Sequence, residues 1–222
     1  MTIAARIAEV RARIAEACRA AGRDPRSVEL VAVSKTVEAA RCAEAVAAGQ
    51  QALGENYAQE LRDKARLVAG ARWHFIGPLQ RNKVKYVVGT AELIHSVDSR
   101  ALADEIAARA EKLGVVQRVL VQVNVGGEAQ KSGCAPGETA ALVEACAARP
   151  SLRCEGLMCI PPLEGDPAPS FRQLRQLAAG LGLRELSMGM SADFAAAIAE
   201  GATLVRVGTA IFGARSQHVG RP

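Results

Sequence analysis

Eight short apolar segments alternate with eight helical segments along this 222-residue chain, and the alternation limits the folds open to it. Continuous apolar runs of this length are typical of strands buried on both faces, as in a parallel sheet. The predicted strands lie at residues 28–34, 51–54, 73–76, 93–97, 119–125, 152–160, 185–188 and 204–207. Predicted helices lie at residues 37–48, 57–68, 82–88, 99–113, 137–148, 171–181, 192–200 and 210–214, after an extra helix at 2–21.

Eight strand–helix units with short, glycine-punctuated links favour closure of the sheet. We therefore predict an α/β protein, a single-domain (β/α)8 TIM-like barrel with an extra N-terminal helix. An open doubly wound sheet is the alternative, although no G-x-G-x-x-G motif follows the first strand and no Walker loop is present. The expected bounds are 1–24 for the N-terminal helix, 28–215 for the barrel and 216–222 for a tail, with no second domain.

Composition narrows the functional classes. Half of the residues are hydrophobic but only 3% are aromatic, so the core is built from Ala, Val, Leu and Ile. The net charge of +5 comes from 28 basic residues interspersed with 23 acidic ones, a pattern that does not indicate a nucleic-acid interface. The six cysteines form no C-x-x-C pair, and there is no signal peptide and no apolar run of 18 residues. We expect a cytoplasmic protein with no bound metal and no membrane contact.

A lysine stands at the carboxyl end of the first predicted strand, in the stretch LVAVSKT that ends at Thr36. Active sites of α/β barrels lie where the strands end in loops. Desolvation there can lower the pKa of Lys35 and leave a neutral amine that condenses with a carbonyl compound. The alternative interpretation is a solvated lysine just past a strand end.

A candidate phosphate site lies after the last two strands. Gly208 and Thr209 follow the last strand, and Ser191 stands at the start of the preceding predicted helix. Barrels of this kind hold phosphate after strands seven and eight, with backbone N–H groups and a helix N-terminus. Taken alone, Gly208-Thr209 is an ordinary turn, Ser191 an N-cap, and His74 in its apolar strand a hydrogen-bonded core residue.

Eight stretches of the chain resemble a known family. They are LVAVSKT, LGENYAQE, WHFIGPLQRNK, HSVDS, VQVNVGGEAQKSG, GLMCIPP, LSMGMSADF and VRVGTAIFGAR, which together span residues 30–215 in one order. These stretches look like the pyridoxal phosphate homeostasis proteins, which have the alanine-racemase-like barrel of the type III pyridoxal-phosphate enzymes.

The resemblance implies that the chain binds pyridoxal 5′-phosphate (PLP) covalently, as an internal aldimine on Lys35. It implies phosphate contacts from Ser191, Gly208 and Thr209, and an Arg206 that faces the pyridine nitrogen. The implied cofactor-binding set is Lys35, Asn56, His74, Met188, Ser191, Arg206, Gly208 and Thr209; Asn56, His74 and Met188 would line the ring. The resemblance also implies transient contact of the protein with pyridoxal-phosphate enzymes, and we expect the protein to be a monomer.

The family is credited with buffering and delivering the cofactor, without an established turnover reaction. Some relatives carry a second lysine where Val37 stands, so Lys131 becomes the candidate for passing the cofactor on. Racemisation needs a base on each face of the substrate, which alanine-racemase-like enzymes supply with Lys and a tyrosine from an additional domain. The two tyrosines here, Tyr57 and Tyr86, fall in early helices. We expect little or no turnover, with a racemase, or an aldolase acting through Lys35, as alternatives.

Overall fold

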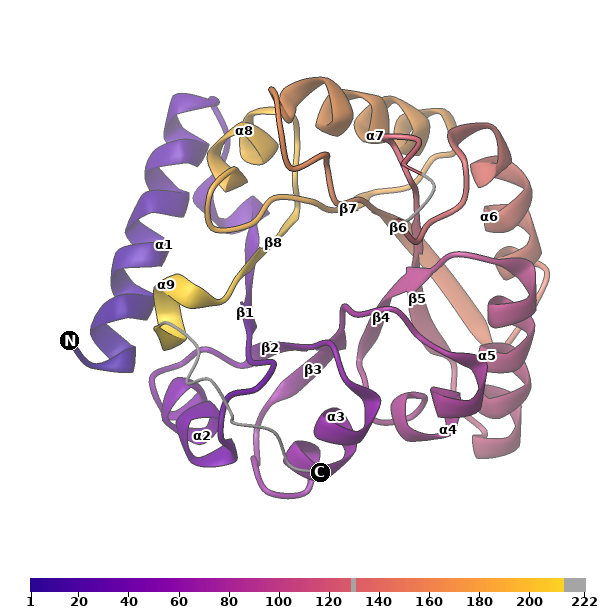
Figure 1. The fold of residues 1–222 in the computed structure, drawn as a ribbon, viewed down its shortest axis with the longest axis horizontal. Coiled ribbons are helices and arrows are strands. Elements are labelled where there is room, and N and C mark those ends of the chain that lie inside the picture. The colour runs from indigo at the N-terminus through magenta and orange to yellow at the C-terminus, as the bar shows by residue number, and fades with distance from the viewer. Residues whose placement is uncertain (129–130, 214–222) are drawn as a thin grey trace.

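The computed structural model describes residues 1–128 and 131–213, and their eight strands close into a barrel in sequence order (Figure 1). The strands are β1 (Glu29–Val33), β2 (Ala52–Glu55), β3 (Arg72–Phe75), β4 (Leu93–Val97), β5 (Gln117–Gln122), β6 (Leu152–Met158), β7 (Glu185–Ser187) and β8 (Leu204–Val207). Every neighbouring pair is parallel, including the β1–β8 pair that closes the ring. The predicted fold class is confirmed.

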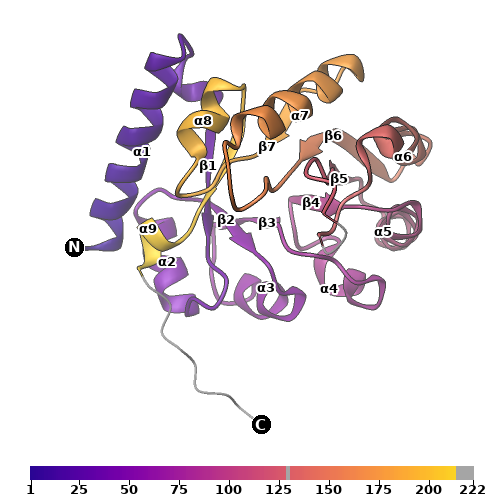
Figure 2. The ribbon, with the colours of Figure 1, turned by 45° about the horizontal axis from the view of Figure 1, so that its top comes forward.

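The helices surround the strands. They are α1 (Ile3–Ala20), α2 (Ala39–Ala47), α3 (Ala58–Ala65), α4 (Val84–Val87), α5 (Arg100–Leu113), α6 (Thr139–Ala147), α7 (Ala168–Gly180), α8 (Phe194–Ala199) and α9 (Thr209–Phe212). The extra helix, α1, lies on the outside of the ring beside α2, α8 and α9 (Figures 1 and 2). Its apolar residues recur every three or four positions, so one face is buried: Ile3, Ile7, Val10, Ile14 and Cys18. No helix in the described ranges is long and apolar enough to cross a bilayer.

Two apolar clusters form the core. The larger one packs the outward faces of the strands against the helices. The smaller one fills the middle of the barrel with one residue each from five strands, Val31, Leu93, Leu120, Met158 and Leu204. Closure also needs a glycine at position 156, because a Cβ there would lie 1.9 Å from the Glu185 carbonyl oxygen. The barrel interior is therefore packed rather than open, as in other barrels of eight strands.

The N-terminal ends of the strands are closed by charged side chains. Glu29 pairs with Arg72, whose guanidinium also lies 3.2 Å from Glu92. Arg118 continues the row, 2.6 Å from Glu92 and 2.8 Å from Glu155. This alternation of sign crosses β1, β3, β5 and β6 and leaves each charge beside an opposite one.

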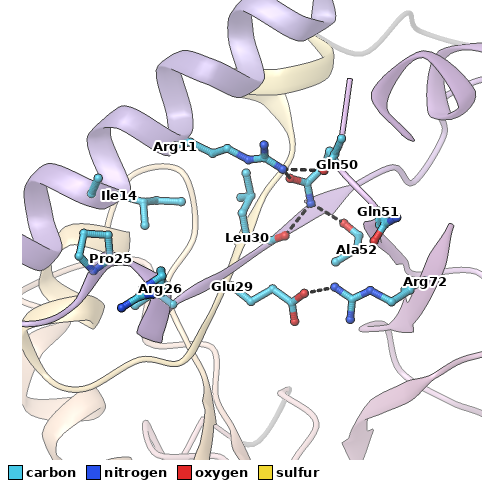
Figure 3. Close-up of a pocket in the computed structure, with 13 residues that line it drawn as sticks. Arg11, Ile14, Pro25, Arg26, Glu29, Leu30, Gln50, Gln51, Ala52 and Arg72 are labelled. Atoms are coloured by element: carbon cyan, nitrogen blue, oxygen red, sulfur yellow. Dashed lines mark hydrogen bonds and ion pairs between the residues drawn. The ribbon is translucent and has the colours of Figure 1, made fainter. Parts of the chain in front are cut away.

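A cavity of about 350 Å³ lies between α1 and the start of β1 and β2, next to this charged row (Figure 3). Its polar groups are occupied by neighbours in the fold. Arg11 donates to the Gly49 carbonyl oxygen at 2.8 Å, and Gln50 Nε2 donates to the Leu30 and Ala52 carbonyl oxygens at 2.7 and 2.8 Å. The cavity is at the end of the barrel opposite Lys35, and its contacts tie α1 to the sheet.

Several predicted element ends shift by a few residues. The expected helix at 82–88 is a 3-10 turn at Arg81–Lys83 followed by the single turn of α4, and the expected strand at 119–125 is Gln117–Gln122. The helix expected from residue 192 begins at Phe194, with Asp193 as its N-cap residue. The predicted tail at 216–222 and the last two residues of the predicted barrel span lie outside the described residues.

Candidate functional site

The closing strand pair brings Lys35 next to Gly208 and Thr209. Lys35 follows β1 directly and Gly208 follows β8, and these strands pair with Val31 opposite Arg206 and Ala32 opposite Val207. Lys35, Gly208 and Thr209 line one small cavity of about 40 Å³ at the carboxyl end of the barrel. Residues 174 positions apart in sequence therefore meet at the mouth, as the positions of their strands predict.

A side chain at Gly208 would crowd this close approach. A Cβ at that position would lie 3.2 Å from both the Cβ and the carbonyl oxygen of Val33. The Gly208 carbonyl oxygen accepts from the N–H groups of Ile211 and Phe212, which starts α9 at the cavity. The first N–H groups of a helix have no acceptor within the helix. The N–H groups of Thr209 and Ala210 are therefore candidate donors in the turn that lines the cavity with Lys35.

The residue after Lys35 has a strained backbone. Thr36 has a φ of 61°, and it is the one non-glycine residue with positive φ among those described. This conformation costs roughly 1–3 kcal/mol for a β-branched residue and persists only where neighbouring groups hold it. Glu60 supplies such a group, because its Oε2 accepts from the Thr36 N–H at 2.9 Å.

A buried ionic network joins the ends of β1 and β2, next to Lys35, to α3. Glu55, the last residue of β2, accepts through Oε1 from the Ser34 hydroxyl at 2.6 Å and from Lys64 Nζ at 2.8 Å. Lys64 also donates to the Ser34 carbonyl oxygen at 2.8 Å and to Glu60 at 2.7 Å. Burial opposes the charge on Lys64, but Glu55 and Glu60 outweigh it and raise its pKa. Burial raises the pKa of Glu55, against the opposing effect of Lys64.

A second network, of buried hydrogen bonds, begins at Arg206 and runs across the barrel interior. Its Nη1 donates to the Ser187 hydroxyl at 2.6 Å and its Nη2 to the Cys159 carbonyl oxygen at 2.9 Å. Ser187 lies 2.8 Å from His95 Nδ1, and His95 Nε2 lies 2.9 Å from His74 Nδ1. Among the residues described, Arg206 makes no ion pair.

The direction of the hydrogen bonds in this chain follows from Arg206. A guanidinium only donates, so Ser187 accepts from it, and the Ser187 proton finds an acceptor in this chain only if it is donated to His95 Nδ1. His95 then donates through Nε2 to His74 Nδ1, which leaves the proton of neutral His74 on Nε2. That atom is buried and has no partner among the described residues.

Asn56 follows the carboxyl end of β2 and so lies at the same end of the barrel as Lys35. Its Oδ1 is buried without a partner in the described part of the chain, and its backbone packs so tightly on Gly77 that a Cβ there would lie 2.3 Å from the Asn56 carbonyl oxygen. Asn56 lines a second cavity, of about 170 Å³, together with Gln122, Asn124 and Lys131. Lys131 is anchored there by the Pro161 carbonyl oxygen at 3.0 Å and by Glu128.

Two predicted site residues lie elsewhere than expected. Ser191 is in a turn and is not the N-cap of α8, because the helix begins only after Asp193; the Asp193 carboxylate accepts from the Met190 N–H at 2.5 Å. Met188 is fully buried and belongs to the outer cluster, on the side of β7 opposite Ser187. Its contact with a bound ring stays a prediction.

The sequence interpretation missed Ser187, His95, Glu60 and Lys64 as members of the two networks. For Glu60 and Lys64 a signal was available, since an i,i+4 acidic–basic pair lies on α3 just after Glu55. Ser187 and His95 gave none, because nothing in their short strands shows which side chains face each other across the barrel. Within the described residues, no group of three or more His, Cys, Asp or Glu could hold a metal ion.

Comparison with known proteins gives consistent matches over nearly the whole chain. The model of the alanine racemase N-terminal domain matches residues 6–216. A Pseudomonas aeruginosa protein named pyridoxal phosphate homeostasis protein is 50% identical over 221 residues, covering 96% of each chain. The Escherichia coli K12 protein of the same name is 44% identical over 226 residues, covering 96% of this chain and 97% of the other.

Solved structures agree. PipY from Synechococcus elongatus, solved with PLP bound, is 39% identical with a TM-score of 0.81, covering 96% of this chain and all of that one. The alanine racemase of Corynebacterium glutamicum is 18% identical with a TM-score of 0.68, and this chain covers only 62% of it. The second likeness is one of fold.

The buried histidines make stability depend on pH. Burial lowers the pKa of His74 to about 4 from its ordinary 6.5, and it also lowers the pKa of His95. Between pH 6.5 and 4 the unfolded chain therefore binds more protons than the folded one, so stability is lost as the pH falls. We expect His74 to account for a loss of about 3 kcal/mol in the free energy of unfolding. Urea unfolding across this range measures it.

The His74→Leu variant separates this effect from the titration of carboxylates. Its free energy of unfolding should fall less steeply between pH 6.5 and 4 than that of the wild-type protein, whatever its value at pH 7. Parallel pH dependences of the two proteins would contradict the assignment of a neutral, buried His74.

Proposed function

The chain belongs to the alanine racemase N-terminal domain family, and within it to the pyridoxal phosphate homeostasis proteins, and on that basis we propose that it holds PLP covalently through Lys35. The observation that carries the proposal is the cavity that joins Lys35 to Gly208 and Thr209. An amine beside a turn of N–H donors suits a ligand that has both a carbonyl group and a phosphate.

The residues present fit such a ligand. When bound, PLP supplies an aldehyde carbon for the amine and a dianionic phosphate. Thr209 can offer its hydroxyl, and the start of α9 offers the N–H groups that precede the two already bonded to Gly208. Gly208 lets this backbone approach β1, and Ser191 lies in the turn before α8 as a further hydroxyl donor. We assign these three residues to the phosphate.

Arg206 is proposed to face the pyridine nitrogen. It is buried in the barrel wall with its guanidinium fixed by Ser187 and Cys159. A guanidinium stays charged and only donates, so an acceptor that faces Arg206 remains unprotonated. Asn56 and His74 each have a buried polar atom without a partner among the described residues, and a bound ring could engage both atoms.

We propose that the protein serves PLP homeostasis with little or no turnover of its own. Besides Lys35 and Thr209, the small cavity is lined by groups that cannot exchange a proton at neutral pH, such as Val33, Val37 and Phe212. Neither tyrosine is among the residues that line this cavity. Tyr57 is exposed before α3, and the Tyr86 ring lies under the Arg62 guanidinium, 5.0 Å from its centroid.

The remaining proposals concern the setting. All six cysteines are free thiols, which supports a reducing, cytoplasmic location. Buffering and delivery would require transient contact with pyridoxal-phosphate enzymes, and we propose that the protein acts as a monomer. Lys131, anchored beside Asn56 at the neighbouring cavity, is the proposed second lysine for cofactor transfer.

Borohydride trapping tests the covalent proposal. Borohydride reduces a condensation product of lysine and an aldehyde to a stable amine, so PLP-loaded protein should yield one modified peptide that contains Lys35. Lys35→Ala should abolish this peptide, while the control Lys83→Ala should retain it. A modification at Lys83 or Lys131 in place of Lys35 in the wild-type protein would contradict the assignment.

The phosphate site predicts a graded loss of affinity. Removing one hydrogen bond to a charged group costs about 1–3 kcal/mol, so Ser191→Ala and Thr209→Val should each weaken PLP binding by that amount. Thr209 is exposed and Ser191 half-buried, so the double variant should fold normally. Equilibrium dialysis against PLP, with pyridoxal as the ligand lacking phosphate, measures both effects. Unchanged PLP affinity in the double variant would place the phosphate elsewhere.

Turnover is tested with alanine on PLP-saturated protein. We expect D/L interconversion and deuterium exchange at the α-carbon to stay far below about 1 per second, an ordinary enzyme rate. The reason is that the described residues lining the cavity with Lys35 include no second proton-transfer group. Interconversion at or above that rate would favour the racemase alternative.

A further inference from the structure

We infer that Glu60, Lys64 and Glu55 are positioning residues that fix the backbone of Lys35 in the orientation that presents its amine. The inference deepens the proposed function, on which it rests for the role of Lys35. It concerns the buried network behind β1, which touches the peptide groups on both sides of residue 35 and lies outside the proposed contacts to PLP.

The two peptide groups that flank the Lys35 Cα are each held by an ionised side chain. The preceding group offers the Ser34 carbonyl oxygen, which accepts from Lys64 Nζ at 2.8 Å. The following group offers the Thr36 N–H, which donates to Glu60 Oε2 at 2.9 Å. Lys64 and Glu60 are themselves 2.7 Å apart. One ion pair thus grips both peptide planes, and so fixes the two dihedral angles that aim the Lys35 side chain.

Lys64 is held in one place. It is only 7% exposed, and its three ammonium protons have three acceptors: the Ser34 carbonyl oxygen, Glu55 Oε1 and Glu60 Oε2. Glu55 is fully buried and also accepts from the Ser34 hydroxyl. The residue before Lys35 is therefore tied through both its side chain and its carbonyl group.

A role in stability alone does not account for this arrangement. Replacing a buried ion pair with apolar residues is often neutral or stabilising, so such a pair is weak evidence for a stabilising role. Thr36 points to a local role instead, because strained residues of this kind cluster at binding and catalytic sites. Thr36, with its positive φ, directly follows Lys35 in the chain. The carboxylate that accepts from its N–H is that of Glu60, a member of the network.

The test compares three substitutions on α3 in the full-length protein. Glu60→Ala removes the acceptor of the Thr36 N–H, and Glu60→Gln keeps an oxygen there but loses the charge. Asp63→Asn is the matched control, because it breaks the exposed Arg62–Asp63 pair, which is on the same helix but shares no bond with the network. Glu60 is about a third exposed, so its truncation leaves no buried void.

Two readouts are used. The first is the rate of PLP attachment, followed by visible absorbance and mapped by borohydride trapping. The second is hydrogen exchange at the Thr36 amide in cofactor-free protein. We expect Glu60→Ala to slow attachment and to speed amide exchange at least tenfold each, Glu60→Gln to lie between it and the wild-type protein, and Asp63→Asn to change neither. The free energy of unfolding, measured in urea, should differ little among the four proteins.

Two results would overturn the inference. One is wild-type attachment and exchange rates in Glu60→Ala. The other is a loss of attachment that follows a matching loss of unfolding free energy, which would make the network structural only. Failure of the proposed function has a different signature: wild-type protein would then trap no PLP on Lys35, while the exchange rate of the Thr36 amide would still report whether the network holds the backbone.

Discussion

The pairing of β1 with β8 is the interaction on which the site depends. This pair turns the row of eight strands into a closed ring, and it joins the first strand of the chain to the eighth. Without it Lys35 and Gly208 would belong to separate edges of an open sheet, and the cavity between them would not exist. The packing of α1 against α2, α8 and α9 covers this closing region from outside (Figure 2). The extra N-terminal helix therefore stabilises the part of the barrel that carries the amine.

The fold and part of the site could be predicted because the signals are local. Short apolar runs separated by glycines give the strands, and parallel strands put Lys35, Gly208 and Thr209 at one end. The networks could not be predicted, because each depends on which faces the strands present to one another. Ser187 and Met188 are adjacent in sequence, yet one joins Arg206 inside the barrel and the other packs outside. Strand pairing register decides this, and composition does not reveal it.

The polar groups of the interior are divided between the two ends of the barrel. The N-terminal end is closed by a row of paired charges, whereas the carboxyl end has Arg206 without an ion-pair partner among the described residues and two neutral histidines. Between these two ends lies the smaller apolar cluster of the barrel interior, which includes Val31, Leu93 and Leu120. Burying a cation without an opposite charge beside it costs free energy. An anionic or electron-rich ligand bound at the carboxyl end would therefore gain the most from contact with Arg206.

Holding a cofactor and turning it over make different demands on such a site. Holding requires a fixed amine, donors for a phosphate and a rigid surround, and the ties on Ser34 and Thr36 supply rigidity around Lys35. Turnover also requires a group that accepts a proton and later returns it near neutral pH. The buried histidines are poorly suited, since burial lowers the pKa of His74 to about 4 and Arg206 donates only. These two properties support the proposal of a homeostasis function over a racemase.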